Sequence, residues 1–266
     1  MRNITIGQFY NVDSVIHRLD PRVKILFALL FVVSLFVGRN PVMFVVACIV
    51  LSVYIKLSHV PIKFIFRGTK TLGTLVLLTG LMNLFTVKGT SVVFEWGFIK
   101  ITESGIQAAI YTSLRLILMM IGSSMMTYTT TPNSLTDGLE KMLGWLNKCG
   151  VPVHQFAMIM SIALRFVPVL VDELDKIMKA QTARGIDFNE GNLYQRLKKL
   201  VPILIPLLVS AIKRSEELAM AMDARCYHGG EGRTKMKPLQ YQRRDFVAYT
   251  LIFVYFVGMI ALAITF

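Results

Sequence analysis

Residues 246–266 read FVAYTLIFVYFVGMIALAITF and contain no charged side chain. The hydrocarbon core of a bilayer is about 30 Å thick, and a helix needs about 20 apolar residues to cross it. The sequence therefore predicts a membrane-spanning helix here. The composition agrees, because 54% of all residues are apolar and only 17% are charged, which disfavours an ordinary soluble enzyme and a nucleic-acid-binding protein.

Four more apolar stretches precede this one, at residues 25–38, 40–55, 71–87 and 104–131, the last interrupted by Arg115. We interpret the first as a retained helix rather than a signal peptide, because no A-x-A cleavage pattern follows it. Asp20 can cap its free N–H groups and Pro21 suits the first helical position; Asn40 and Pro41 repeat this arrangement before the second stretch. The chain is thus predicted to be an all-α integral membrane protein with about five transmembrane helices.

Basic residues are concentrated before the first stretch and between the second and third, which predicts a cytoplasmic N-terminus. The basic residues counted there are Arg2, Arg18, Arg22, Lys24, Lys56, Lys63, Arg67 and Lys70. The alternate connections hold fewer, namely Arg39, Lys88 and Lys100. Five crossings of the cell membrane then leave the C-terminus extracellular. Residues 92–101 alternate around Trp96 and Gly97, which predicts a small β-hairpin at the outer face.

Residues 132–244 form a more polar insert, which predicts three parts: a membrane domain at 1–131 with four transmembrane helices, a cytosolic domain at 132–244, and a final transmembrane helix at 245–266. The apolar spacing within the insert predicts a short amphipathic helix at 135–146 and long helices at 154–184 and 193–225. Pro168, Pro202 and Pro206 predict bends in the long helices. Neither is predicted to span, because Arg165 interrupts the first and the uncharged part of the second is too short.

Each long helix ends in a matching triplet, Ala183-Arg184-Gly185 in the first and Ala224-Arg225-Cys226 in the second. For a single triplet a structural role suffices, because a cation complements the C-terminal helix dipole and glycine closes a left-handed cap. Two copies favour a docking role. A small alanine lets another protein approach, and the planar arginine fork suits a carboxylate in a cleft.

Taken together, these features resemble the transmembrane T component of energy-coupling factor (ECF) transporters over nearly the whole chain. The resemblance rests on the paired triplets and on three further segments: Ser14, His17, Leu19, Asp20, Pro21, Arg22 and Lys24; residues 129–132 followed by Leu135; and residues 164–168. It implies an L-shaped α-helical protein in which the insert is a cytosolic coupling domain. The arginines of the triplets would dock into grooves on two cytoplasmic ABC ATPase subunits.

The resemblance also implies a small substrate-binding membrane subunit, the S component, which captures a vitamin or a metal ion; the sequence does not decide whether it is dedicated or exchangeable. Cys226 stands where the family commonly has glycine, which leaves a different type of cap open at that helix end. The chain contains no G-x-x-x-x-G-K-[ST] phosphate loop, so ATP and Mg²⁺ are expected on the partner ATPases. The predicted function is a non-catalytic scaffold that couples ATP hydrolysis to movement of the S component, with no cofactor, catalytic residue or metal ligand of its own.

Two other functions stay open: a permease subunit of an ordinary ABC transporter that translocates the substrate itself, and a membrane-embedded lipid-modifying enzyme. The enzyme would need Mg²⁺ at Asp172, Glu173 and Asp175, although a solvated helix face explains this cluster better. Cys48, Cys149 and Cys226 are too far apart in sequence to signal a disulfide framework or a zinc site. Arg115 lacks an acidic partner in the apolar stretches, so we expect snorkelling, carbonyl contacts or pairing with another subunit.

Overall fold

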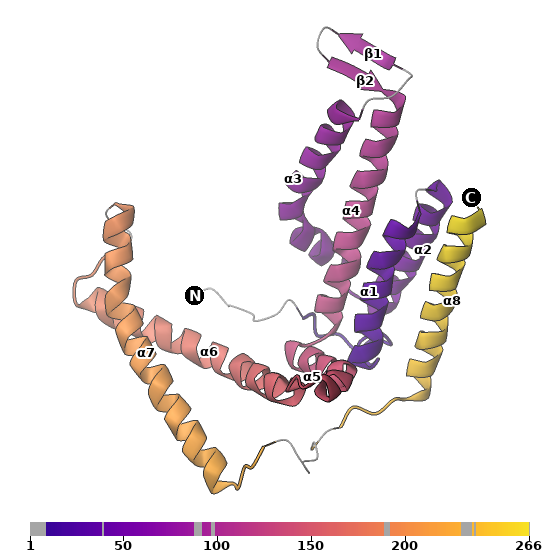
Figure 1. Cartoon of the computed structure of the whole chain (residues 1–266). Coiled ribbons are helices and arrows are strands. Elements are labelled where there is room, and N and C mark those ends of the chain that lie inside the picture. The colour runs from indigo at the N-terminus through magenta and orange to yellow at the C-terminus, as the bar shows by residue number, and fades with distance from the viewer. Residues whose placement is uncertain are drawn as a thin grey trace. The chain divides into compact units, whose positions relative to one another are not determined.

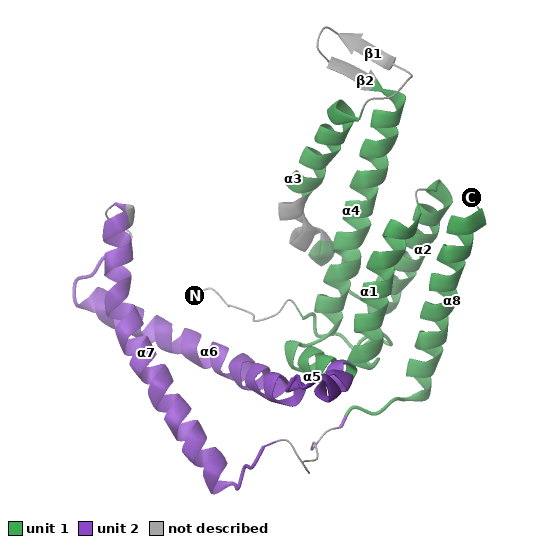
Figure 2. Cartoon of the chain, in the orientation of Figure 1, with its two compact units in different colours: residues 1–142, 239–266 green, residues 143–238 purple. Residues whose placement is uncertain are grey.

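The computed structural model describes residues 9–38, 40–87, 92–96, 99–188, 192–229, 236 and 238–265, without the side chains of 66–72, 92–101 and 193. Several residues used in the sequence analysis lie outside this description: Arg2, Arg39, Lys88 and Gly97, and the side chains of Arg67, Lys70, Trp96 and Lys100. The chain forms two compact units, residues 1–142 with 239–266 and residues 143–238 (Figure 2). We describe each unit by itself.

The first unit consists mainly of helices whose axes run in roughly the same direction (Figure 1). They are α1 (Pro21–Val37), α2 (Pro41–Ser58), α3 (Ile62–Thr86), α4 (Glu103–Thr129) and α8 (Arg243–Thr265), and the short helix α5 (Pro132–Leu143) lies across one end of them. All five predicted apolar stretches are helical. In Figure 1 the C-terminal ends of α1, α3 and α8 lie toward one end of the unit, and that of α4 lies toward the other. This is the alternation that five crossings require.

Three helices within the described residues are long and apolar enough to cross a membrane, namely α2, α4 and α8. Helix α1 has 17 residues, and the apolar part of α3 is Gly73–Thr86. The predicted all-α membrane fold is confirmed, whereas the number of crossings and their orientation stay predictions. The predicted hairpin is confirmed as β1 (Val92–Trp96) paired antiparallel with β2 (Ile99–Thr102).

The core of this unit forms around α1, which contacts α2, α4 and α8. Phe31 is fully buried, and a Cβ atom at Gly122 of α4 would lie only 2.6 Å from its ring. Glycine is therefore what lets α4 approach α1 this closely. Stacked rings continue the core, with centroids of Phe27 and Tyr54 4.7 Å apart, a spacing that favours aromatic attraction.

The caps of α1 and α2 differ from one another. The Asp20 side chain accepts a hydrogen bond from the backbone N–H of Arg22 at 2.9 Å, as predicted. The prediction for Asn40 was wrong, because its side chain makes no capping hydrogen bond. Its backbone carbonyl instead accepts from the N–H of Met43 at 3.2 Å. Pro41 at the first helical position is therefore enough to start α2 at the predicted residue, without a side-chain cap.

A buried charged cluster joins the starts of α1 and α8, and we call Asp20, Arg22, Lys24 and Asp245 the base clamp. Asp245 is only 2% exposed and accepts hydrogen bonds from the backbone N–H groups of Asp20 (2.9 Å) and Gln242 (2.7 Å). One carboxylate therefore satisfies donors at two helix N-termini, where negative charge is also favoured by the helix dipoles.

The two cations of the base clamp complete it. Arg22 forms an ion pair with Asp20 at 3.3 Å and lies over the ring of Tyr241 at 4.2 Å. The buried ammonium of Lys24 donates to the carbonyls of His17 (3.2 Å) and Thr129 (2.9 Å), which ties α1 to the end of α4. The ion pair of Arg22 and the two hydrogen bonds of Lys24 offset part of the cost of burying these charges.

The second unit contains the 3-10 helix η1 (Gly144–Cys149) and the two long helices α6 (Val153–Ala183) and α7 (Leu193–Ala224). Both predicted long helices are confirmed to within one residue at each end. Neither appears among the described helices that are apolar enough to span a membrane. Pro168 lies inside α6, and Pro202 and Pro206 lie inside α7.

The two compact units divide after residues 142 and 238, and the predicted boundaries of the membrane and cytosolic parts at 131 and 244 stay predictions. Helix α5 belongs to the first unit because it packs closely on α1: a Cβ atom at Gly138 would lie 3.0 Å from Pro21 and 3.2 Å from Ile25. The predicted helix at 135–146 is α-helical only to Leu143 and continues as η1.

Candidate functional site

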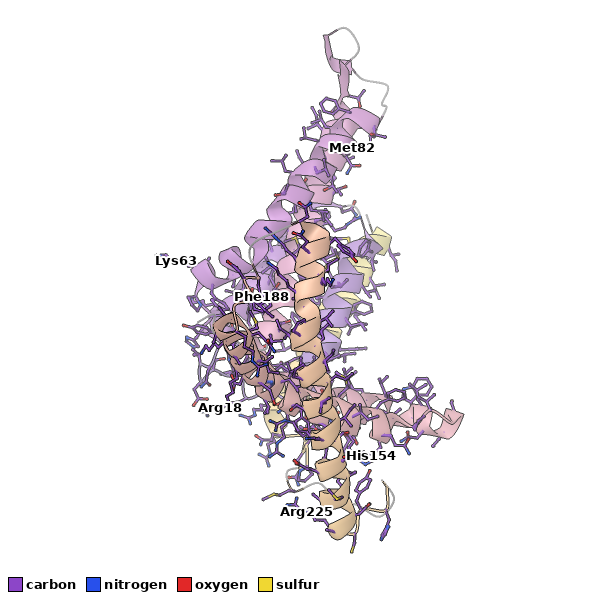
Figure 3. The ribbon with its side chains drawn as sticks, turned by 90° about the vertical axis from the view of Figure 1, so that its left-hand side faces the viewer. Arg18, Lys63, Met82, His154, Phe188 and Arg225 are labelled. Carbon is purple, nitrogen blue, oxygen red and sulfur yellow. The ribbon has the colours of Figure 1, made fainter. Side chains whose placement is uncertain are left out.

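Helices α6 and α7 form an antiparallel pair. Polar side-chain contacts join them at three levels, namely Tyr227 Oη to Met158 Sδ (2.9 Å), Ser210 Oγ and Arg214 Nη2 to the Glu173 carboxylate (2.6 and 2.8 Å), and Gln181 Nε2 to the Pro202 carbonyl (3.2 Å). In these contacts the residue numbers increase along α6 while those of their partners on the α7 side decrease, so the two helices run in opposite directions. The two triplets therefore lie at opposite ends of the pair. Figure 3 labels Arg225 at one end of α7 and Phe188, in the connection from α6, toward the other.

The first triplet lies in a regular left-handed cap at the end of α6. Arg184 is the C-cap residue and Gly185 has a φ of 93°. The N–H of Gly185 donates to the carbonyl of Thr182 at 2.9 Å, and the N–H of Ile186 donates to that of Gln181 at 3.1 Å. These two bonds define the Schellman motif, which fixes the backbone that carries Arg184.

The second triplet has the same cap, which answers the question raised by its cysteine. Cys226 adopts a φ of 54°, and its N–H donates to the carbonyl of Asp223 at 2.9 Å. The N–H of Tyr227 donates to the carbonyl of Met222 at 3.1 Å. Arg225 therefore stands in the same local geometry as Arg184, although a residue with a side chain occupies the left-handed position.

Both triplets present their side chains to the exterior of the unit. Ala183, Arg184 and Gly185 are exposed, and so are Ala224, Arg225 and Cys226. Within the described part of the chain, neither guanidinium donates a hydrogen bond or forms an ion pair. The structure thus brings each predicted triplet together but holds the two apart. Each offers a planar, five-donor fork beside a small alanine, a geometry that fits a carboxylate on another molecule.

The left-handed position predicts opposite effects for two matched substitutions. A residue with a Cβ atom costs about 1–2 kcal/mol in this conformation. Cys226→Gly is therefore expected to stabilise the last turn of α7, and Gly185→Cys to destabilise that of α6, where an added Cβ would meet nothing within 4 Å. Amide hydrogen exchange at Tyr227 and Ile186 measures both. Unchanged protection in the two variants would show that other contacts hold the caps.

Sequence reasoning missed the role of Glu173. We interpreted its acidic cluster as a solvated face, and this was wrong for Glu173, which lies half-buried between the helices. Hydrogen bonds from Ser210 and Arg214 hold its pKa below the ordinary value. Its position between Leu170 and Ile177 on the apolar stripe of α6 was the available signal. Asp172 and Asp175 are exposed. Within the described residues no cluster of three or more His, Cys, Asp or Glu side chains could hold a metal ion.

Arg115 in α4 adopts the carbonyl contact that was one of the predicted alternatives. Its Nη2 donates to the backbone carbonyl of Gly38 at 3.4 Å. The guanidinium also lies over the rings of Phe36 and Phe44, at 5.3 and 5.8 Å from their centroids. Aromatic faces and a free helix-end carbonyl together reduce the cost of a cation within an apolar helix.

The fold and the site define a class: a helical membrane protein that carries two exposed arginine caps at the ends of one helix pair. Residues 13–236 match the CbiQ family, described as cobalt transport protein. The chain therefore belongs to this family, and within it to the transmembrane components of ECF transporters, to which its curated relatives also belong.

Three of these relatives carry the name "energy-coupling factor transporter transmembrane protein EcfT". The protein of Clostridium kluyveri is 48% identical over 249 residues, which cover 93% of this chain and 92% of the relative. That of Ruminiclostridium cellulolyticum is 43% identical over 266 residues, covering 100% and 99%. That of Bacillus subtilis is 42% identical over 245 residues, covering 92% of each. The predicted resemblance is confirmed.

Proposed function

We propose that this chain is the membrane scaffold of an ECF-type importer and transmits the motion of two cytoplasmic ABC ATPase subunits to an S component that binds a vitamin or a metal ion. The observation that carries the proposal is the pair of exposed arginines, each in the same type of cap at the C-terminal end of its helix. Because α6 and α7 are antiparallel, the two arginines lie at opposite ends of the helix pair. The partner ATPases bind ATP and Mg²⁺, and this chain performs no catalysis.

The separation of the two arginines suits two motor subunits rather than one. The part of α6 between the contacts at Met158 and Gln181 rises about 35 Å. Arginines at the two ends of such a pair enter separate grooves, one on each ATPase subunit. When ATP closes the ATPase pair, the distance between these grooves changes and the helix pair must move with them.

Exposed apolar side chains on the helix pair support the docking of a hydrophobic partner. Large side chains that are about half or more exposed include Phe156, Ile159, Leu204, Ile205 and Leu208. Exposed apolar surface of this kind marks an interaction site. In our proposal the S component covers it, and the insert lies on the cytoplasmic side, with the N-terminus inside and the C-terminus outside.

The proposal is tested by affinity purification of the tagged chain from its native membranes. We expect two nucleotide-hydrolysing proteins and a small hydrophobic subunit to copurify. Vesicles containing this complex should take up at least one member of a labelled panel of riboflavin, folate, thiamine, biotin and Co²⁺ when ATP is supplied. Recovery of the chain without nucleotide-hydrolysing proteins would overturn the proposal. Binding of a panel member to the isolated chain would instead indicate a permease that holds the substrate itself.

A further inference from the structure

We propose that Gln181 is a positioning residue that makes α6 and α7 move as one body, through a hydrogen bond to a backbone group that Pro206 leaves without its helical donor. This inference rests on the proposed function, because it assigns Gln181 a part in transmitting motion from Arg184 to α7.

The hydrogen bond replaces one that the sequence of α7 cannot make. In an α-helix the carbonyl of residue 202 accepts from the N–H of residue 206, but Pro206 has no N–H. The Gln181 side chain donates to this carbonyl instead, with Nε2 3.2 Å from the Pro202 oxygen. Gln181 is only 8% exposed, so water competes little for the bond. A backbone carbonyl in a partly buried helix interface is stabilised by such a partner.

The backbone of Gln181 has a second role in the cap that presents Arg184. Its carbonyl accepts hydrogen bonds from the N–H groups of Arg184 and Ile186, both at 3.1 Å. One residue therefore holds the arginine cap with its main chain and α7 with its side chain. A force on Arg184 passes to α7 through a path of two hydrogen bonds.

The contacts elsewhere along the pair are more open to solvent. A pocket of about 180 Å³ that opens to the surface lies between the helices, lined by residues that include Ile162, Phe166 and Leu218. The ion pair of Glu173 with Arg214 is partly open to solvent, with side chains 24% and 38% exposed, and such pairs contribute little. Gln181 makes the buried polar contact nearest to the Arg184 end.

The test separates a mechanical role from simple satisfaction of the carbonyl. Pro206→Ala supplies the missing N–H, and a carbonyl oxygen can accept two hydrogen bonds. In both Pro206→Ala and Gln181→Leu/Pro206→Ala the Pro202 carbonyl then has a helical donor. The two variants differ in the hydrogen bond from Gln181 to Pro202, which only the single variant keeps. Each variant is purified as the full complex, and ATP hydrolysis and uptake of the labelled panel are measured in vesicles.

We expect both complexes to keep their ATPase subunits and to hydrolyse ATP at similar rates, and the double variant to import about tenfold less per ATP hydrolysed, as loss of a buried hydrogen bond predicts. Gln155→Leu/Pro206→Ala, which changes an exposed glutamine of the same helix, should match Pro206→Ala. Equal import per ATP by the first two variants, or loss of the ATPase subunits only from the double variant, overturns the inference. Neither outcome affects the proposed function, which the wild-type complex tests.

Discussion

Arg184→Glu and Arg225→Glu are each expected to abolish uptake while the chain still folds and inserts. Both side chains are exposed, so reversal of their charge should change the stability of the fold by only about 0.5 kcal/mol. On the partner, a carboxylate would lose its cation and meet another anion. Removing one member of a buried charge pair already costs about 2–5 kcal/mol, so we expect ATPase binding to weaken roughly 100-fold or more. Copurification of ATPase subunits and labelled uptake measure the effect.

Exposed lysines on the same helices provide the matched control. Lys176→Glu in α6 and Lys213→Glu in α7 make the same change of charge away from the caps. They should retain ATPase binding and uptake close to the wild type. Because the two arginines act on two linked ATPase subunits, Arg184→Glu/Arg225→Glu should bind the ATPase subunits more weakly than either single variant does. Wild-type uptake by Arg184→Glu/Arg225→Glu would refute the docking role of both triplets.

The local patterns of the sequence were enough to predict most helices and both triplets. Length and apolar content determine where helices such as α2 and α8 form, and helical periodicity with Gly185 at the end determines where α6 stops. Such signals depend on residues within a few turns of one another. They could not show that α6 and α7 pair antiparallel, and therefore that the arginines lie at opposite ends.

Contacts distant in sequence account for what was missed. Glu173 binds a residue 37 positions away and Gln181 one 21 positions away, and no pattern in a single helix reveals such a partner. Their places on the apolar stripe of α6 signalled burial but not the partner. Cys226 shows the opposite case, since its residue type argues against the left-handed conformation that the surrounding hydrogen bonds impose. Tertiary context overrides local preference at these positions.

Asp245→Ala is expected to have the largest effect on the fold itself. The sequence placed Asp245 at the edge of the last transmembrane helix, yet it accepts a hydrogen bond from Asp20, 225 positions earlier. Alanine would leave the N–H groups of Asp20 and Gln242 without their acceptor and remove a negative charge near Arg22 and Lys24. Breaking a buried charged network in this way costs about 3–5 kcal/mol, a large part of the 5–15 kcal/mol that usually holds a folded protein together.

Thermal unfolding of the purified chain in detergent measures this loss. Asp13→Ala is the control, because it removes an aspartate whose ion pair with Arg18 is exposed, with side chains 77% and 59% accessible. Exposed pairs contribute about 0–1 kcal/mol, so this variant should melt close to the wild type. Asp245→Asn should fall between the two, since it keeps one acceptor oxygen but no charge. If Asp245→Ala and Asp13→Ala unfold at the same temperature, the base clamp does not hold α8 to α1. Packing around Phe31 would then be what holds the two helices together.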